Sequence, residues 1–178
     1  GESAADEIIR ERQKNGPFKS YMEFLDRVDL HSVNRKAMEV LIKTGCFDKI
    51  EPNRNRLLIN FEAAIEYAES KKESTRYGQA SLFEDTDIQE FVEFKYQEVE
   101  DWPQIEKLRI EKELIGFYIS GHPLDSYKKV MERCTTMNSS KMANALPDTD
   151  YTIAVLVTEV RKIITKKGTA MGIVTGKD

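Results

Sequence analysis

The chain has 178 residues, enough for one ordinary domain or two or three small ones, and its 27 basic and 31 acidic side chains leave a net charge of −4. This balance excludes a global basic field that would drive nucleic-acid binding. The 40% hydrophobic and 33% charged residues exclude collagen-like, disulfide-framework and fully disordered chains. No apolar run approaches the roughly 18 residues of a membrane span, and the charged first residues contain no signal-peptide core, so we expect no membrane association and a cytoplasmic location.

Residues 1–70 predict short helices with their own start and stop signals. Ser3 precedes the first helix, which Asn15-Gly16-Pro17 ends. Ser20 and Glu23 match the capping box, in which two side chains satisfy free amides at a helix start.

Two further helices are expected in the same region. Asn34 is placed to cap the first of them, and Gly45 supplies the left-handed residue that ends it. After Pro52, apolar residues recur at helical spacing over about four turns. They are Leu57, Phe61, Ala64, Ile65 and Ala68.

Residues 71–101 break this pattern. Residues 71–79 have no apolar period and predict a linker or exposed loop. Between Glu84 and Asp101, eight acidic residues accompany a single base, Lys95, which indicates a solvated or weakly ordered connection.

Residues 102–134 predict a helical connector. Asp101 is placed to cap a helix with Pro103 in its first turn, and residues 120–123, Ser-Gly-His-Pro, end it. Four apolar residues of this helix are expected to share one face: Ile105, Leu108, Ile115 and Ile119. We interpret Trp102, Phe117 and Tyr118 as core and turn residues, and expect a short helix around Tyr127–Met131.

Residues 135–178 switch to a β pattern. YTIAVLVTEVRKIIT is rich in β-branched residues, KKG is a candidate hairpin turn, and TAMGIVTGKD predicts the returning strand. Two or three strands are too few for a stable sheet, so we expect the start of a truncated domain. The expected fold class is mainly α with a C-terminal β segment.

Cysteine and histidine positions argue against a catalytic or metal site. Cys46 and Cys134 lie far apart without a nearby histidine, and we predict that both are buried reduced thiols. His31 and His122 each stand alone beside turn signals.

The pentapeptide Gln79-Ala80-Ser81-Leu82-Phe83 places two large apolar residues in the predicted loop. In an extended peptide, Leu82 and Phe83 can fill a groove on a partner, each stabilising the complex by about 1.5–3 kcal/mol, while the Gln79 amide fixes the register. The pattern leaves open the alternative that Leu82 and Phe83 fold back onto their own domain.

Four stretches of the chain, taken in order, resemble the C-terminal region of the bacterial DNA polymerase III alpha subunits, which are C-family replicative polymerases. They are GPFKSYMEFLDRVDL, VNRKAMEVLIKTGCFD, WPQIEKLRIEKELIGFYISGHPLD and VLVTEVRKIITKKGTAMGIVTGKD. The resemblance implies a helix-hairpin-helix DNA-binding region at 1–70, a loop with a sliding-clamp-binding pentapeptide and an acidic linker at 71–101, a helical connector at 102–134 and a truncated OB-fold at 135–178. Gln79, Leu82 and Phe83 match that pentapeptide, of the type Q-x-x-L-F.

Basic residues form two candidate DNA-binding groups. Arg35, Lys36, Lys43, Arg54 and Arg56 could line a duplex backbone, or could belong to a mixed-charge solvated face. Because the resemblance places the first helix and most of the glycine hairpin before residue 1, we expect weak DNA binding from this region. Arg161, Lys162, Lys166 and Lys167 surround the predicted hairpin, but the chain after Tyr127 has only one aromatic residue, Tyr151, so single-strand binding rests on the resemblance.

The resemblance also implies where polymerisation chemistry resides. It places the metal-binding carboxylates in a palm domain outside this segment, so we expect no cofactor and no catalytic activity here, although the parent resembles a DNA-directed DNA polymerase. Two hypotheses result. The chain is a non-catalytic segment that tethers a replicative polymerase to its clamp, helps hold primer-template DNA and meets other replicase subunits through the parent. Alternatively, it is an independent nucleic-acid-binding module with no clamp partner.

Overall fold

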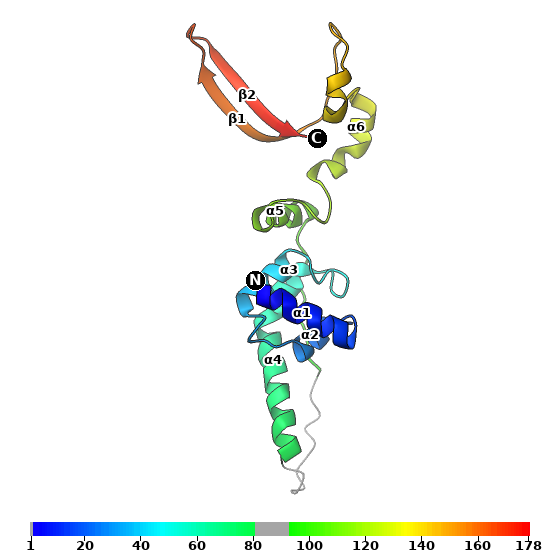
Figure 1. Ribbon diagram of the computed structural model, residues 1–178, viewed down its shortest axis with the longest axis vertical. Helices are drawn as coiled ribbons and strands as arrows, with labels where there is room; N and C mark the ends of the chain where they lie inside the picture. Colours follow the sequence, from blue (N-terminus) through cyan, green and yellow to red (C-terminus); the bar gives the residue numbers. More distant parts are fainter. Residues whose placement is uncertain (1, 81–92) are drawn as a thin grey trace. The chain divides into compact units, whose positions relative to one another are not determined.

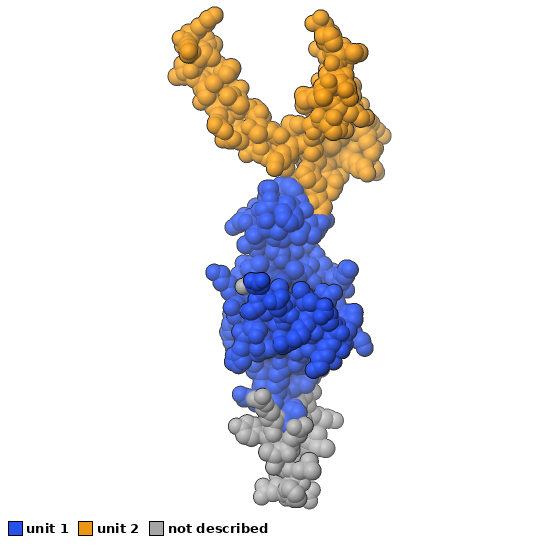
Figure 2. Space-filling model, viewed as in Figure 1, with its two compact units in different colours: residues 1–120 blue, residues 121–178 orange. Residues whose placement is uncertain are grey.

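The computed structural model describes residues 2–80 and 93–178, with residues 76–80 described by backbone alone. The chain divides into two compact units, residues 1–120 and residues 121–178 (Figure 2). The first unit is helical and the second ends in a two-stranded antiparallel sheet, which confirms the predicted fold class (Figure 1). Among the described residues, no helix is long and apolar enough to cross a membrane.

Four helices form the body of the first unit: α1 (Glu2–Asn15), α2 (Tyr21–Arg27), α3 (Arg35–Lys43) and α4 (Arg54–Ala80). The predicted caps of α2 and α3 are confirmed, because Ser20 Oγ accepts from the Glu23 amide at 3.1 Å and Asn34 Oδ1 accepts from the Ala37 amide at 2.9 Å. Ser3, which was expected to precede the first helix, instead lies within α1. The Glu23 carboxylate accepts from the Lys19 amide, one residue before the cap. Gly45 follows α3 with φ +80°, the left-handed conformation that glycine adopts most readily.

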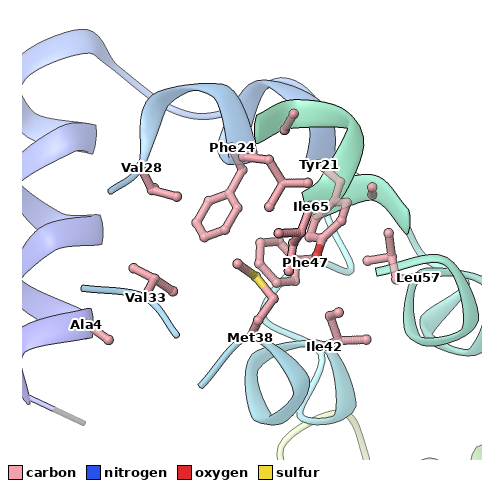
Figure 3. Packing of buried hydrophobic residues seen from close by; sticks show 13 residues of the cluster. Ala4, Tyr21, Phe24, Val28, Val33, Met38, Ile42, Phe47, Leu57 and Ile65 are labelled. Atoms are coloured by element: carbon pink, nitrogen blue, oxygen red, sulfur yellow. The ribbon is translucent and has the colours of Figure 1, made fainter. Parts of the chain in front are cut away.

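The hydrophobic core of this unit lies between the four helices. The rings of Tyr21, Phe24 and Phe47 meet at its centre, with centroids 4.8–6.2 Å apart (Figure 3). From α4, the predicted apolar face contributes Leu57, Ala64, Ile65 and Ala68, all buried. These residues pack because α4 presents them at helical spacing to α2 and α3.

Helix α4 continues to Ala80, so the interpretation of residues 71–79 as a loop was wrong. Two lysines attach this part of the helix to the end of α2. Lys71 pairs with Asp26 at 3.0 Å, and Lys72 Nζ donates to the carbonyls of Leu25 and Val28 at 2.8 and 3.3 Å. Residues without an apolar period therefore remain helical, because their side chains bond to a neighbouring element.

Residues 93–101, which we call the strap, were expected to be a solvated connection. The structure contradicts this, because the strap runs along α4 and its alternate side chains Phe94 and Tyr96 are half-buried against the core. Helix α5 (Gln104–Leu114) follows and begins after Pro103, not at the predicted Asp101 cap. Helix α5 ends at Leu114, before the stop predicted at residues 120–123. Of the apolar face predicted for this helix, Leu108 is buried, whereas Ile105 and Ile119 are exposed. Phe117, which we interpreted as a core or turn residue, is also exposed.

The second unit contains η1 (Pro123–Tyr127), α6 (Lys128–Cys134), η2 (Ser139–Asn144) and the strands β1 (Leu156–Ile164) and β2 (Ala170–Lys177). The strands pair antiparallel from Leu156 opposite Lys177 to Ile164 opposite Ala170, and the predicted turn carries Gly168 at φ +76°. Strand side chains such as Val160 and Ile164 are exposed, as two strands alone bury little. Cys46 and Cys134 are exposed free thiols, so the prediction that they are buried was wrong.

Candidate functional site

The candidate clamp-binding pentapeptide begins near the C-terminal end of α4. The backbone of Gln79 is helical, one residue before the helix ends at Ala80, whereas Leu82 and Phe83 lie outside the described residues. Among the α4 residues whose side chains the structure describes, Ala68 is the last buried one. The helix therefore carries the chain about three turns beyond the core before the pentapeptide starts.

The strap returns the chain along the same helix. Asn60 forms two hydrogen bonds to the main chain of the strap. Asn60 Nδ2 donates to the Gln97 carbonyl at 3.0 Å, and Asn60 Oδ1 accepts from the Gln97 amide at 2.8 Å. Asn53 Nδ2 donates to the Val99 carbonyl at 2.7 Å, and Asn55 Nδ2 to the Glu100 carbonyl at 2.8 Å. These bonds hold the strap by its main chain.

Aromatic and charged side chains add to the strap's attachment. Phe94 lies against Tyr67 and Tyr96, with ring centroids 5.5 and 5.0 Å apart. Arg56 stacks over the Tyr96 ring at 5.3 Å and pairs with Glu98 at 3.0 Å. Both flanks of residues 81–92 are thus anchored to one unit, through α4 on one side and the strap on the other.

In the helical unit, most of the candidate DNA-binding bases have acidic partners. Arg35 pairs with Glu62 at 3.1 Å and Lys43 with Glu39 at 2.5 Å. Arg56 pairs with Glu51 as well as Glu98. Lys36 is exposed and has no ion-pair partner among the described residues. This arrangement fits the mixed-charge face more closely than a phosphate-binding surface.

Arg54 is buried, with 2% of its surface exposed, and cannot reach a phosphate from this position. Its Nε and Nη2 donate to the two carboxylate oxygens of Asp48 at 2.9 and 2.7 Å, and its Nη1 donates to the Lys43 carbonyl at 3.2 Å. Arg54 Nη1 also donates to the carboxylate of Glu111 on α5, which is fully buried, at 2.9 Å. Arg54 therefore connects the turn after α3 to α5.

Glu111 extends this network to the end of the first unit. Its Oε2 accepts from the amides of Ile119 at 2.7 Å and Ser120 at 3.0 Å. Burial alone would raise the pKa of Glu111, but these amides and Arg54 outweigh it and hold the pKa below its ordinary value. Burial by itself would lower the pKa of Arg54, but the bonds to Asp48 and Glu111 outweigh it and raise the pKa above its ordinary value.

Sequence reasoning missed this network, although one signal was available. Glu111 stands three residues after Leu108 and four before Ile115, on the face that was expected to be apolar. A carboxylate on such a face needs a buried cationic or amide partner. The identity of that partner, Arg54, follows only from the packing of α5 against the α3–α4 region.

The second group of bases lies on the β1–β2 hairpin. Arg161 pairs with Glu159 at 2.7 Å on the same strand, so part of its charge is neutralised. Lys162, Lys166 and Lys167 are exposed and have no ion-pair partner among the described residues. The strand register places Lys162 opposite Gly172, and Lys166 and Lys167 occupy the turn. These three lysines thus present free ammonium groups.

Among the described residues, no group of histidine, cysteine, aspartate and glutamate side chains could hold a metal ion. Asp101, at the end of the acidic tract, is instead committed to structural bonds. It pairs with Lys107 and accepts from the Trp102 amide at 2.8 Å.

Comparisons with known proteins agree with the fold and the motifs. A family model described as "Helix-hairpin-helix motif" matches residues 1–57. "DNA polymerase III subunit alpha" of Treponema pallidum is 42% identical over 171 residues, which cover 96% of this chain. Proteins of the same name are 35% identical over the whole of this chain in Vibrio cholerae and 37% over 96% of it in Borreliella burgdorferi.

The chain is homologous to a segment of DNA polymerase III subunit alpha. The family named from the four sequence stretches is thereby confirmed, as is the helix-hairpin-helix element in the first unit. The chain spans only 15% of the length of these three DNA polymerase III alpha relatives. For this segment, the activity and partners of a complete alpha subunit are therefore proposals.

Proposed function

We propose that this chain is a non-catalytic segment of a replicative DNA polymerase that tethers the enzyme to its sliding clamp. The observation that carries the proposal is the anchoring of both flanks of residues 81–92. Helix α4 delivers Gln79 beyond the core, and the strap begins its return at residue 93. A peptide presented in this way is available to a partner while its ends stay attached to a folded unit.

The mechanism of the tether is effective concentration. A modest peptide contact with a ring that encloses DNA keeps the polymerase near the primer end between nucleotide additions. Leu82 and Phe83 supply apolar side chains for a groove on the clamp, and the Gln79 amide supplies hydrogen bonds that set the register.

A second, weaker role is to help hold primer-template DNA. The free lysines of the hairpin, Lys162, Lys166 and Lys167, favour contacts to phosphates, as in the basic groove of an OB-fold. The same observation favours the alternative function, an independent helix-hairpin-helix and OB nucleic-acid-binding module. Against that alternative stand the ion pairs that occupy Arg35, Lys43 and Arg56 in the first unit.

We place the polymerisation chemistry, and the divalent metal ions that it uses, in a palm domain outside this segment. The segment itself takes no cofactor, works in the cytoplasm and reaches other replicase subunits through the parent polymerase.

Fluorescence anisotropy of the labelled chain, titrated with the sliding clamp of the same bacterium, tests the tether. The Leu82→Ala/Phe83→Ala variant should bind the clamp about a hundredfold or more weakly, because two buried apolar side chains are lost. Its melting temperature should stay near that of the wild type.

The matched control is Leu114→Ala/Phe117→Ala, which removes the same side-chain types at positions 44% and 59% exposed. Clamp affinity should be unchanged in this control. Failure of the wild-type chain to bind at micromolar concentration, or equal loss in both variants, would contradict the tether. A large fall in melting temperature for the Leu82/Phe83 variant would instead show that the pair packs in its own domain.

A further inference from the structure

The junction between the two compact units falls immediately before Gly121. Gly121 has φ +151°, in the region that favours glycine. The hydrogen bonds before Gly121 belong to unit 1, and those after it belong to unit 2. Together they determine how many backbone dihedrals at the junction are free to rotate.

On the first side, the chain is held by unit 1 up to Ser120. The buried carboxylate of Glu111 accepts from the amides of Ile119 and Ser120 at 2.7 and 3.0 Å. Gln104 Nε2 also donates to the carbonyl and hydroxyl oxygens of Ser120, at 3.3 and 3.1 Å. Because Glu111 is itself bonded to buried Arg54, this anchor is part of the rigid interior of unit 1.

On the second side, the chain is held by unit 2 from His122 onward. The His122 amide donates to Asp125 Oδ2 at 2.6 Å, and the Leu124 amide donates to His122 Nδ1 at 3.3 Å. The Asp125 amide closes the turn by donating to the His122 carbonyl at 2.9 Å. Pro123 restricts the backbone here further, since its ring fixes φ.

One residue remains between the two anchors. Neither the amide nor the carbonyl of Gly121 has a hydrogen-bond partner among the described residues. We propose that Gly121 is a one-residue hinge between the units, with the Arg54–Glu111 network holding the chain rigid up to its edge. Hinges of this kind consist of a few residues at the ends of elements that absorb the backbone rotation.

The hinge lies between the two parts of the chain to which we assign different functions. The anchored flanks of residues 81–92 belong to unit 1, and the lysine-bearing hairpin belongs to unit 2. Rotation at Gly121 reorients the hairpin while the hydrogen bonds that hold Ile119 and Ser120 in unit 1, and those that hold residues 122–125 in unit 2, stay intact. The inference does not depend on clamp binding, since it concerns the backbone between the units.

The chain carries its own pair of probe sites. Cys46 in unit 1 and Cys134 in unit 2 are exposed free thiols, and they are the two cysteines of the sequence. Spin labels on both report the distance distribution between the units by pulsed electron paramagnetic resonance. We expect a broad distribution for the wild type, and a single narrow distance would overturn the hinge.

Two substitutions at the junction restrict the hinge in steps. Gly121→Ala removes positive φ, about half of the backbone conformations open to glycine, and Gly121→Pro confines φ to about −65°. The distance distribution between the two spin labels should be narrower in Gly121→Ala than in the wild type, and narrower still in Gly121→Pro. Gly16→Ala is the matched control, a glycine at φ +80° within unit 1 with open space around it, and should leave the distribution unchanged. A Pro variant as broad as the wild type would overturn the proposal.

The anchor has a readout of its own. In the wild type, the amides of Ile119 and Ser120 should exchange with solvent slowly and that of Gly121 rapidly. Glu111→Gln should speed exchange at Ile119 and Ser120 about tenfold or more, since charge-assisted hydrogen bonds are lost, and should broaden the distance distribution. Unprotected Ile119 and Ser120 amides in the wild type would overturn the anchor even if this variant fails to fold.

Discussion

At the scale of single residues, Arg54 shows how tertiary contacts can change the role of a charged side chain. It lies at the start of α4, where a basic residue is compatible with DNA binding. In the fold it joins Asp48, the carbonyl of Lys43 and Glu111, all through bonds of 3.2 Å or less. Because Arg54 and Glu111 are both buried, loss of either leaves an uncompensated charge in the interior.

This geometry predicts a strong dependence of stability on the pair. Arg54→Met should lower the free energy of unfolding by about 3–5 kcal/mol, and adding Glu111→Met should restore much of the loss, because no unpaired charge then remains buried. Urea unfolding followed by the fluorescence of Trp102, the single tryptophan, measures both.

The control for this series is Arg35→Met, which removes an ion pair whose two side chains are 53% and 58% exposed. It should cost less than about 1 kcal/mol. A double variant no more stable than Arg54→Met alone would contradict the buried-charge explanation.

The lowered pKa of Glu111 predicts a pH dependence with a definite sign. Its folded-state pKa lies below the unfolded value of about 4.5, so the stabilisation is complete above that pH and is lost as pH falls through the folded pKa. Melting temperatures measured from pH 6 to pH 3 should fall less steeply in Glu111→Gln than in the wild type. Parallel curves would show that Glu111 is not the titrating group.

At the scale of elements, the strap shows an extended segment held by the side chains of a helix. Asn55 and Asn60 lie on α4 and Asn53 immediately precedes it, and all three bond to main-chain atoms of residues 97–100. Main-chain atoms are the same in every residue, so these bonds do not require a particular strap sequence. Its acidic residues can therefore face solvent while the backbone stays attached.

Asn60 makes two hydrogen bonds to the strap's main chain, and a single substitution tests both. Asn60→Ala removes two bonds to Gln97 and should cost about 1–3 kcal/mol in local stability. Hydrogen exchange at the Gln97 amide should accelerate about tenfold or more. Asn15→Ala, which loses an exposed bond to Glu11, is the control and should leave that exchange rate unchanged. Unaltered Gln97 exchange in Asn60→Ala would show that the aromatic contacts alone hold the strap.

At the scale of the whole molecule, charge is distributed unevenly between ion-paired and free side chains. The net charge is −4, and four of the five candidate DNA-binding bases of the helical unit form ion pairs. Of the free lysines considered for DNA contact, Lys36 lies in unit 1, and Lys162, Lys166 and Lys167 lie on the hairpin of unit 2. Clamp contact and nucleic-acid contact are therefore expected to respond to salt in different ways.

This difference predicts two distinct salt profiles. Clamp binding through apolar side chains should persist at moderate salt, whereas single-stranded DNA binding should be weak and should fall steeply with salt. Replacing Lys162, Lys166 and Lys167 by Ala should reduce the DNA slope, log affinity against log salt, by about 2, at about 0.7 per lost phosphate contact. Anisotropy titrations between 50 and 200 mM salt, roughly the range in which such contacts weaken, measure this slope.

A triple alanine variant at the exposed residues Lys14, Lys19 and Lys129 controls for the change in net charge. Equal slopes in the two triple variants would show that the hairpin does not contact the phosphates. DNA binding that withstands salt would contradict the electrostatic account altogether.

The sequence by itself determined what depends on neighbouring residues. The caps at Ser20 and Asn34, the turn at Gly45, the buried face of α4 and the β1–β2 hairpin all follow from local spacing and residue type. The resemblance to DNA polymerase III alpha subunits was also readable in four continuous stretches. The role of Gln79, Leu82 and Phe83 in clamp binding stays a prediction.

Only the tertiary structure decided the features that join distant parts of the chain. The continuation of α4 through residues 71–80 depends on Lys71 and Lys72 reaching α2, and the strap depends on asparagines some 40 residues earlier. The burial of Arg54 required Glu111, which is 57 residues away. Local patterns record the propensity of a segment, whereas these contacts arise from which elements pack together, and that information is not contained in any single stretch of sequence.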